Sequence, residues 1–423
     1  MNSAQYSGLM PPIARLYLNW QLLRAFAFRG YWLVTSVYLV VVADLSPFQL
    51  VIMGTAMELT ILASEVPTGV LADTISRRAS IVVSHLVMGV GMLATGLVTD
   101  FAALVATQVL WGFGYTFASG ADIAWITDEL DDDTRIDQVL TTDARRRQYG
   151  AIAGMVGIGL LAWVAGMGAA IVASGVVMLA LGLLVALRFT EHNFTPTREN
   201  RWQESVAIFH RGVALGRADR QILLVLAVTL LVSSGAEAFD RLHPKRLIDL
   251  GFPEQPDPIV WFTVLGVAML VVGALALRIV EARIHREGTP RLALLVACVV
   301  GAVGMLTLAH APNEVAGIAG TMLVGGVAWT VIRAVSSIWV NRRTTSDVRA
   351  TVQSFLGQAE SIGEITGGVV MAIVAQAASI SVALTASAGL LFLAAAATGR
   401  SRAGRVGDDD SSLAAPSPAP TNG

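Results

Sequence analysis

The stretch that decides the fold is Glu65-Val-Pro67-Thr-Gly69-Val-Leu71-Ala-Asp73-Thr-Ile-Ser-Arg77-Arg78. It joins two long apolar runs, and it brings one carboxylate and two guanidinium groups together within residues 73–78. Because the connection is so short, the two flanking apolar segments must be antiparallel neighbours. We therefore expect a charged, glycine-marked turn at a membrane surface, between two spanning helices.

Composition places the chain in a membrane. Of its 423 residues, 54% are hydrophobic and 14% are charged, and the mean hydropathy is +0.64. Soluble domains carry about 25% charged residues, so this chain cannot hide its apolar surface in a water-soluble core. Lys245 is the only lysine, which excludes the Gly-Lys-Ser/Thr phosphate loop of ATP-driven pumps. Cys298 is the single cysteine, and the histidines show no metal-ligand spacing, so we expect no disulfide, metal or cofactor.

Twelve apolar stretches have the length of about 20 residues that crosses a bilayer core. They are expected to be helices, because a closed barrel would show alternating strands of about ten residues. The predicted fold class is an all-α membrane protein with twelve transmembrane helices in two six-helix bundles. The fifth stretch is the shortest. The predicted spans are 16–43, 49–71, 79–98, 101–126, 149–164, 169–189, 221–241, 259–280, 291–310, 314–339, 353–375 and 380–398.

Arginine distribution predicts the orientation of these spans. The connections after spans two, four, eight and ten carry arginines, whereas those after spans one, three, five, nine and eleven carry neither arginine nor lysine. By the positive-inside rule, the arginine-bearing connections are cytoplasmic, and so are both termini. We expect a multi-pass protein of the plasma (inner) membrane whose first span is retained as an uncleaved insertion signal.

The domain plan follows from the polar segments. We expect an N-terminal six-helix bundle over 1–189, a cytoplasmic linker over 190–220, a C-terminal bundle over 221–398 and a disordered tail over 399–423. Helical spacing of Trp202, Val206, Phe209 and Val213 favours an amphipathic helix in the linker, and a plain surface linker is the alternative. Similar residue patterns at the ends of spans four and ten suggest that the bundles are repeats.

Twelve spans, a central loop and the pattern Gly69-x-x-x-Asp73-x-x-x-Arg77-Arg78 after span two together resemble the major facilitator superfamily. The stretch is similar to the family signature Gly-x-Leu-Ala-Asp-Arg-x-Gly-Arg-Lys, from which it departs at Thr74, Ser76 and Arg78. Phrases in spans four and seven and before span eleven look like bacterial efflux-type, drug/proton antiporter-like members. The resemblance implies a monomeric rocker-switch carrier in the lipid bilayer, with a small-molecule substrate and protons as partners and no nucleic acid.

The same resemblance implies a gating motif. By likeness, Asp73 meets the N-terminus of span eleven, where the helix dipole favours an anion, and Asp128 at the end of span four is placed to pair with Arg77. Exposed pairs of this kind are worth about 1 kcal/mol or less, so a cluster of them can form and break. The alternative is that the arginines only orient the chain. The gating candidates are Gly69, Asp73, Arg77, Arg78 and Asp128.

Two departures from the family leave proton-coupled export open. The span-four signature tied to proton transfer has an arginine four residues before a glycine, and Gln108 stands at that position before Gly112. The antiporter signature of span five ends in Gly-Pro-x-x-Gly-Gly, whereas here Gly150 and Gly159 keep part of the spacing and no proline follows.

Charged residues inside spans carry a large penalty when they face lipid, so they normally face a partner or a cavity. Glu58 lies roughly 13 Å into span two. Arg29 reaches a similar depth in span one, and Arg24 lies nearer the cytoplasm. We expect Glu58 and Arg29 to form a buried pair that lines the pathway, with a static salt bridge between helices as the alternative.

Further ionisable residues share helix faces. Glu237 and Arg241 are spaced i, i+4 beside Asp240, so they either satisfy each other or line the outer vestibule. Glu360 and Glu364 share one face of span eleven, where two neighbouring carboxylates suit proton binding, unless each caps a different neighbour. The pathway and proton-coupling candidates are Arg24, Arg29, Glu58, Asp122, Glu237, Asp240, Arg241, Glu360 and Glu364.

These observations favour a secondary active transporter that works by alternating access, with proton-coupled efflux of a small amphipathic or hydrophobic solute. One alternative is proton-coupled or facilitative uptake of a polar metabolite. A second is a transporter-like receptor that binds without flux. An enzyme is disfavoured, because no nucleophile–base or metal constellation occurs in the spans or loops.

Overall fold

The computed structural model describes residues 10–130, 132–196, 220–253, 255–283, 289–343 and 346–400, and within these ranges it contains helices and no strand. Side chains of residues 342–351 are not described. The predicted linker helix at 202–213 and the chain beyond residue 400 lie outside the described residues, so those predictions stay predictions.

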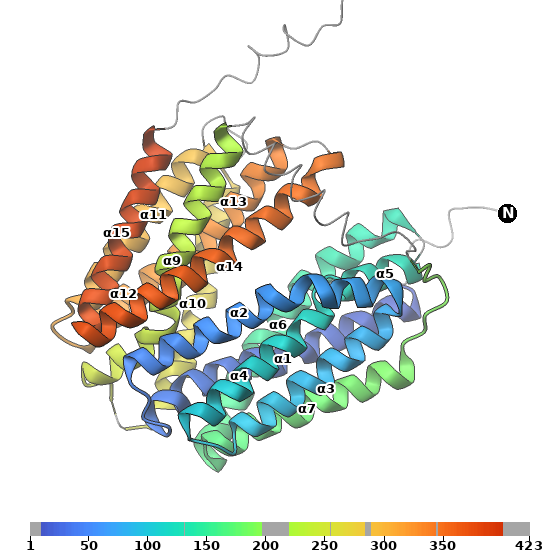
Figure 1. Cartoon of the computed structure of the whole chain (residues 1–423), viewed down its shortest axis with the longest axis horizontal. Helices are drawn as coiled ribbons and strands as arrows, with labels where there is room; N and C mark the ends of the chain where they lie inside the picture. Colours follow the sequence, from blue (N-terminus) through green and yellow to red (C-terminus); the bar gives the residue numbers. More distant parts are fainter. Residues whose placement is uncertain are drawn as a thin grey trace, which may run out of the picture.

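The helices form two bundles that diverge from one side of the molecule to the other (Figure 1). The first bundle, called the N bundle, contains α1 (Pro12–Val41), α2 (Pro47–Thr74), α3 (Arg77–Thr95), α4 (Phe101–Ala118), α5 (Ala121–Leu130), α6 (Asp133–Ala165) and α7 (Met167–Arg188). The second, called the C bundle, contains α9 (Arg220–Asp249), α10 (Pro258–Glu281), α11 (Thr289–Ala309), α12 (Glu314–Thr321), the π-helical segment η1 (Met322–Ala328), α13 (Trp329–Arg343), α14 (Ser346–Ala377) and α15 (Ile380–Arg400). The side on which α1 begins and α15 ends is called the terminal side, and the opposite one the far side.

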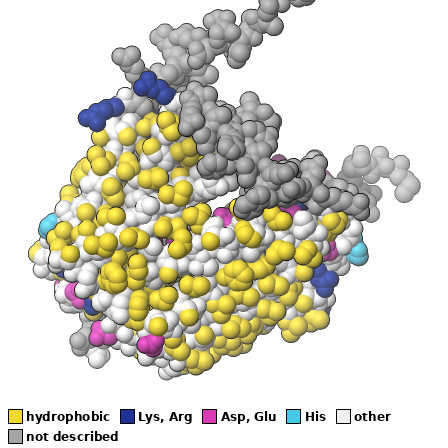
Figure 2. All heavy atoms as spheres, in the orientation of Figure 1, with side chains coloured by type: hydrophobic (Ala, Val, Ile, Leu, Met, Phe, Trp, Pro, Cys, Tyr) yellow, Lys and Arg dark blue, Asp and Glu magenta, His cyan; other side chains and the backbone are white. Residues whose placement is uncertain are grey.

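All twelve predicted spans are helical, which confirms the fold class. Ten helical segments of the described chain are long and apolar enough to cross a membrane, where α4 with α5 and α12 with η1 and α13 each count as one segment. The remaining two spans, α1 and α14, carry ionisable side chains that build the site described below. The face of the molecule seen in Figure 2 is largely apolar, as a lipid-facing surface requires.

Polar residues at the connections explain where helices begin. Ser46 and Gln49 form a reciprocal capping box at the start of α2, with bonds of 2.9 and 3.3 Å. Ser76 caps α3 by accepting a hydrogen bond from the backbone N–H of Ala79 at 2.9 Å, and Asp100 caps α4 in the same way. These caps satisfy backbone donors that would otherwise be orphaned at the membrane surface.

Three local features differ from the sequence predictions. The expected glycine-marked turn is wrong, because Gly69 and Pro67 lie inside α2 and the chain turns only between Thr74 and Arg77. Span four is broken between α4 and α5, where Gly120 has φ +77°. Predicted span five is the second part of α6. This helix begins already at Asp133, because the arginine-rich segment before the span is helical as well.

Glycines bring α6 close to α1 within the N bundle. A Cβ atom on Gly154 would overlap the backbone carbonyl oxygen of Phe26, and one on Gly150 would overlap that of Leu22. Small residues allow helix backbones to approach in lipid, where packing rather than the hydrophobic effect drives association. Gly150 and Gly154 of span five therefore serve close packing of the N bundle.

The two bundles meet on the far side. Gly54 of α2 contacts α9, Gly368 of α14 contacts Thr55 of α2, and Gly159 of α6 contacts α10. All three lie in the far half of their helices. Toward the terminal side, a Cβ atom on Gly69 of α2 would meet nothing within 4 Å. The described parts of the bundles thus separate toward the terminal side.

Candidate functional site

The residues that decided the fold form an ionic network on the terminal side. Arg77 makes an ion pair with Asp73 at 3.2 Å and a second, shorter one with Asp128 of α5. It also donates to the carbonyl oxygen of Ala124 at 3.1 Å. One guanidinium therefore ties the end of α2 to α5, and the expected contact between Arg77 and Asp128 is present.

The segment after α7 adds a partner to this network that the sequence did not reveal. Glu191, which follows α7, accepts hydrogen bonds from the Ser76 hydroxyl at 2.5 Å and from the Arg78 backbone N–H at 3.1 Å. Arg78 also donates to the carbonyl oxygen of Ala186. The turn between α2 and α3 is thereby fixed to α7. Because the side chains at the start of α14 are not described, the predicted contact of Asp73 with span eleven stays a prediction.

Arg24 and Asp122 form a buried ion pair inside the N bundle. The Arg24 Nη1 to Asp122 Oδ2 distance is 2.8 Å, and the residues are 9% and 6% exposed. Gln21 donates to the same carboxylate oxygen at 3.1 Å and to the Tyr17 hydroxyl at 2.9 Å. A buried carboxylate with two side-chain donors is well satisfied, which suits a fixed structural link between α1 and α5.

A second buried pair lies where the bundles touch. Arg241 Nε and Glu237 Oε1, both on α9, are 2.9 Å apart, so the i, i+4 pairing expected from the sequence is present. Both atoms press against Gly54 of α2, where no Cβ atom fits. The Arg241 guanidinium also lies 5.7 Å from the ring centroid of Trp32 on α1. This pair of the C bundle is therefore held against two helices of the N bundle.

Two carboxyl groups from opposite bundles meet beside this pair. Glu58 of α2 is within hydrogen-bonding reach of Glu364 of α14, and Glu237 and Glu360 are further acidic neighbours of both. Arg241 is a cationic neighbour of Glu58. Two carboxylates so close repel each other when both are ionised, whereas a proton shared between them makes a hydrogen bond.

The predicted ion pair between Glu58 and Arg29, both of which the structure describes, does not form. Arg29 of α1 is exposed toward the space between the bundles, where its electrostatic neighbours are Asp240 of α9 and Arg333 of α13. The two residues match in depth along their helices, but depth does not fix the direction in which each helix presents its side chain. Glu58 faces α9 and α14 instead.

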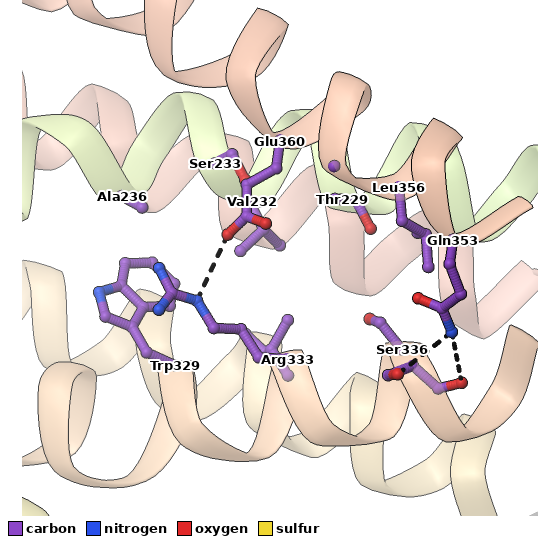
Figure 3. Close-up of a pocket in the computed structure, with 13 residues that line it drawn as sticks. Thr229, Val232, Ser233, Ala236, Trp329, Arg333, Ser336, Gln353, Leu356 and Glu360 are labelled. Carbon is purple, nitrogen blue, oxygen red and sulfur yellow. Dashed lines mark hydrogen bonds and ion pairs between the residues drawn. The ribbon is translucent and has the colours of Figure 1, made fainter. Parts of the chain in front are cut away.

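Arg333 pairs with Glu360 beside a cavity in the C bundle. The Arg333 Nε to Glu360 Oε1 distance is 3.4 Å, and the two side chains are 65% and 39% exposed. The cavity has a volume of about 290 Å³ and lies between α9, α13 and α14 (Figure 3). An acidic partner within the protein therefore holds Arg333.

A family comparison matches this architecture over most of its length. The family described as Major Facilitator Superfamily matches residues 21–368. The chain belongs to the Major Facilitator Superfamily. It is therefore a membrane transporter rather than an enzyme, and the resemblance seen in the stretch from Gly69 to Arg78 is confirmed at the level of the family. No curated relative matches the sequence.

Solved structures of other transporters share the fold. The nucleoside transporter NupG is 14% identical, with a TM-score of 0.74 over 92% of this chain and 98% of that one. The POT family transporter PepTSo is 12% identical, with a TM-score of 0.73 over 93% and 98%. A bacterial homologue of the human lysosomal transporter Spinster, in an inward-facing and unoccupied conformation, is 14% identical, with a TM-score of 0.70 over 92% and 97%. At these identities the likeness shows the fold alone.

This member of the superfamily has a neutral network where the family pattern has an arginine. Gln108 of α4 donates to the Tyr31 hydroxyl at 2.9 Å and to the Thr95 hydroxyl at 3.3 Å, and all three residues are buried. The position thus carries hydrogen bonds within the N bundle and no charge.

Proposed function

We propose that this superfamily member is a proton-coupled secondary transporter that exports a small amphipathic or hydrophobic solute by alternating access. The observation that carries the proposal is the meeting of Glu58 and Glu364 across the two bundles. One carboxyl group belongs to each bundle, so their interaction reports directly on whether the bundles are together. A proton that joins them stabilises contact, and its loss leaves two like charges that push the bundles apart.

The conformation fits one half of such a cycle. The bundles touch in the far half, where Gly54 and Gly368 pack across the interface, and separate toward the terminal side. The arginine distribution supports a cytoplasmic terminal side and a location in the inner membrane. Under that assignment the structure is inward-facing, which is also the conformation named for the Spinster homologue. Protonated carboxyl groups then accompany the inward-facing state.

The signature loop supplies the second half of the cycle. Arg77, Asp73 and Asp128 lie at the end that must close when the far side opens. Pairs that are 16% to 30% exposed are weak enough to rearrange during turnover. We propose that this network, together with Gly69 and Arg78, stabilises the outward-facing state, as the family signature implies. The cavity beside Glu360, with its largely apolar lining, favours an amphipathic solute over a strongly polar one.

The test is proton flux in proteoliposomes loaded with a pH-sensitive dye. Ethidium and tetraphenylphosphonium serve as amphipathic solutes, and uridine serves as a polar one. Under solute/proton exchange, movement of an amphipathic solute across the membrane should drive protons in the opposite direction. Glu58→Gln and Glu364→Gln should each abolish this proton movement, because a neutral amide cannot take up and release a proton. Glu281→Gln, at the exposed end of α10, is the matched control.

Three results would contradict the proposal in different ways. Movement of uridine and protons in the same direction would show uptake by symport. Binding of solutes without any flux would show a receptor. Undiminished proton exchange in both glutamine variants would show that the carboxyl pair between the bundles is structural.

A further inference from the structure

The cavity of the C bundle is lined by both polar and apolar side chains. One end holds the ion pair between Arg333 and Glu360, with Trp329 beside it (Figure 3). Val232 and Leu356 contribute apolar walls. A cavity of about 290 Å³ matches the lower end of the size range of small-molecule sites. Its lining combines apolar walls with a few converging polar groups, as ligand sites do.

The other end of the cavity contains polar atoms that lack partners. The hydroxyl oxygens of Thr229 on α9 and Ser336 on α13 are buried, and neither has a hydrogen-bond partner among the described residues. Ser336 is only 6% exposed. Figure 3 shows both side chains directed toward the space between their helices. A buried hydroxyl without a partner is destabilising, and a ligand with a hydrogen-bonding group would remove that penalty.

The corresponding region of the N bundle is filled instead. Trp111 of α4 packs against Trp32 of α1 at 4.9 Å and against Tyr115 at 5.5 Å between ring centroids. Phe28 and Tyr31 of α1 complete this aromatic cluster. The C bundle therefore has a cavity where the N bundle has an aromatic cluster. A solute that enters between the bundles finds its pocket on the C-bundle side.

The bundle interface beside the cavity carries more carboxyl groups than guanidinium groups. Among the described residues, five carboxyl groups lie in this region, from Glu58, Glu237, Asp240, Glu360 and Glu364, against three guanidinium groups, from Arg29, Arg241 and Arg333. With one proton shared between Glu58 and Glu364, one negative charge is still in excess. A cleft whose walls carry excess charge of one sign attracts solutes of the other sign.

We propose that this cavity binds an amphipathic cation, with the cationic group on Glu360 in place of Arg333 and the apolar body between Trp329, Val232 and Leu356. The partner exchange is feasible because the ion pair of Arg333 and Glu360 is open to solvent. The indole face of Trp329 adds a second attraction for a cation. The inference rests on the proposed function and names its substrate class.

The position of Glu360 links solute and proton. On α14, Glu364 lies one helical turn from Glu360, and Glu58 of α2 is an electrostatic neighbour of both. The other charged groups that face these carboxyl groups are Glu237, Asp240 and Arg241 of α9 and Arg333 of α13. A cation held at Glu360 compensates negative charge that a proton at Glu58 and Glu364 would otherwise compensate. Cation and proton therefore compete, which is the relation that exchange requires.

The experiment measures equilibrium binding to the purified full-length protein by titration calorimetry. Three probes share one apolar body: 4-phenylbutylammonium, the neutral 4-phenylbutan-1-ol and the anionic 4-phenylbutanoate. Wild type should bind the cation most tightly. Glu360→Gln should weaken binding of the cation by about 10- to 100-fold, the effect of losing a charge-assisted hydrogen bond, and leave binding of the alcohol unchanged. Trp329→Leu should weaken binding of the cation and of the alcohol alike, and Glu281→Gln should change neither affinity.

Two further measurements test the details. Arg333→Gln should strengthen cation binding, because the competing cation is gone. Titrations in buffers of different ionisation enthalpy should show proton release on cation binding, and Glu364→Gln should abolish that release. A 4-hydroxyl group on the phenyl ring of the cation should improve binding to wild type more than to Ser336→Ala.

The outcomes separate this site from the proposed function. Preference for the anion, or unchanged cation affinity in both Glu360→Gln and Arg333→Gln, overturns the site, even where proton-coupled flux of other solutes persists. Cation binding that depends on Glu360 but releases no proton overturns the link between solute and proton. Binding with proton release but without flux in proteoliposomes leaves the site standing and refutes the transport proposal.

Discussion

Gly54→Ala is the sharpest test of how the bundles are held together. Gly54 lies in the far half of α2, at the contact with α9. A Cβ atom there would overlap Arg241 Nε and Glu237 Oε1, and it would lie 2.6 Å from Arg241 Cζ. The substitution adds one carbon atom and changes no charge. Its effect therefore isolates the packing of the two bundles on the far side.

The size of the effect follows from this geometry. Comfortable contacts between carbon atoms are about 3.5–4.0 Å, so α2 and α9 must move apart by roughly 1 Å. The Arg241 side chain has little room to move, since it also contacts Glu237 and lies over Trp32. Overpacking of this kind costs about 1–3 kcal/mol. The penalty applies only to the conformation closed on the far side, so the equilibrium should shift toward far-side opening by about 5- to 150-fold.

The assay is distance measurement between pairs of spin labels on the protein in lipid nanodiscs. Cys298→Ala removes the only native thiol, which is buried. One pair, at Val42 and Val315, reports on the far side, and a second pair, at Leu187 and Ile279, reports on the terminal side; all four side chains are exposed. In Gly54→Ala the far-side distances should lengthen and the terminal-side distances should shorten.

A matched control separates packing from helix propensity. Gly389→Ala in α15 makes the same chemical change at a place where a Cβ atom meets nothing within 4 Å. It should leave both distance distributions unchanged. If Gly54→Ala gives the wild-type far-side distribution, or if Gly389→Ala shifts it equally, then the contact at Gly54 does not hold the bundles together and the reasoning is refuted.

Two further predictions concern the ionic networks of the N bundle. Asp122→Asn leaves the buried Arg24 guanidinium without its carboxylate, so it should destabilise the protein by about 3–5 kcal/mol, seen as a lower unfolding temperature in detergent; an unchanged melting curve would contradict a structural role for the pair. Asp73→Asn weakens the Arg77 network without touching the core, so it should reduce solute flux in proteoliposomes while the melting temperature stays within a few degrees of wild type; normal flux would show that the network does not gate transport.

The sequence predicted the positions of the helices better than the contacts between their side chains. The spans followed from hydropathy alone, because a bilayer of fixed thickness demands apolar runs of fixed length. The Arg77–Asp128 and Glu237–Arg241 contacts were also predictable, the first from the family signature and the second from i, i+4 spacing. The glycine-marked turn was mispredicted, since helical continuation through Gly69 depends on packing of α2 that local composition does not express.

Partners of intramembrane charges required the structure. Glu58 was assigned to Arg29 by depth, yet it faces Glu364, and the pairs of Arg24 with Asp122 and of Arg333 with Glu360 were not foreseen. Depth in the membrane follows from residue number. The direction of a side chain around the helix axis depends instead on how each helix is rotated against its neighbours.

By itself, the sequence determined that this protein is a helical membrane transporter of the Major Facilitator Superfamily. Its apolar runs have the length that crosses a bilayer, and its short charged motif is a local pattern of consecutive residues. Only the tertiary structure decided that the bundles meet on the far side, that Glu58 and Glu364 face each other between them, and that the C bundle contains a cavity. Those features arise where surfaces of distant helices come together. Their shapes depend on helix crossing and rotation, which residue spacing along one helix does not fix.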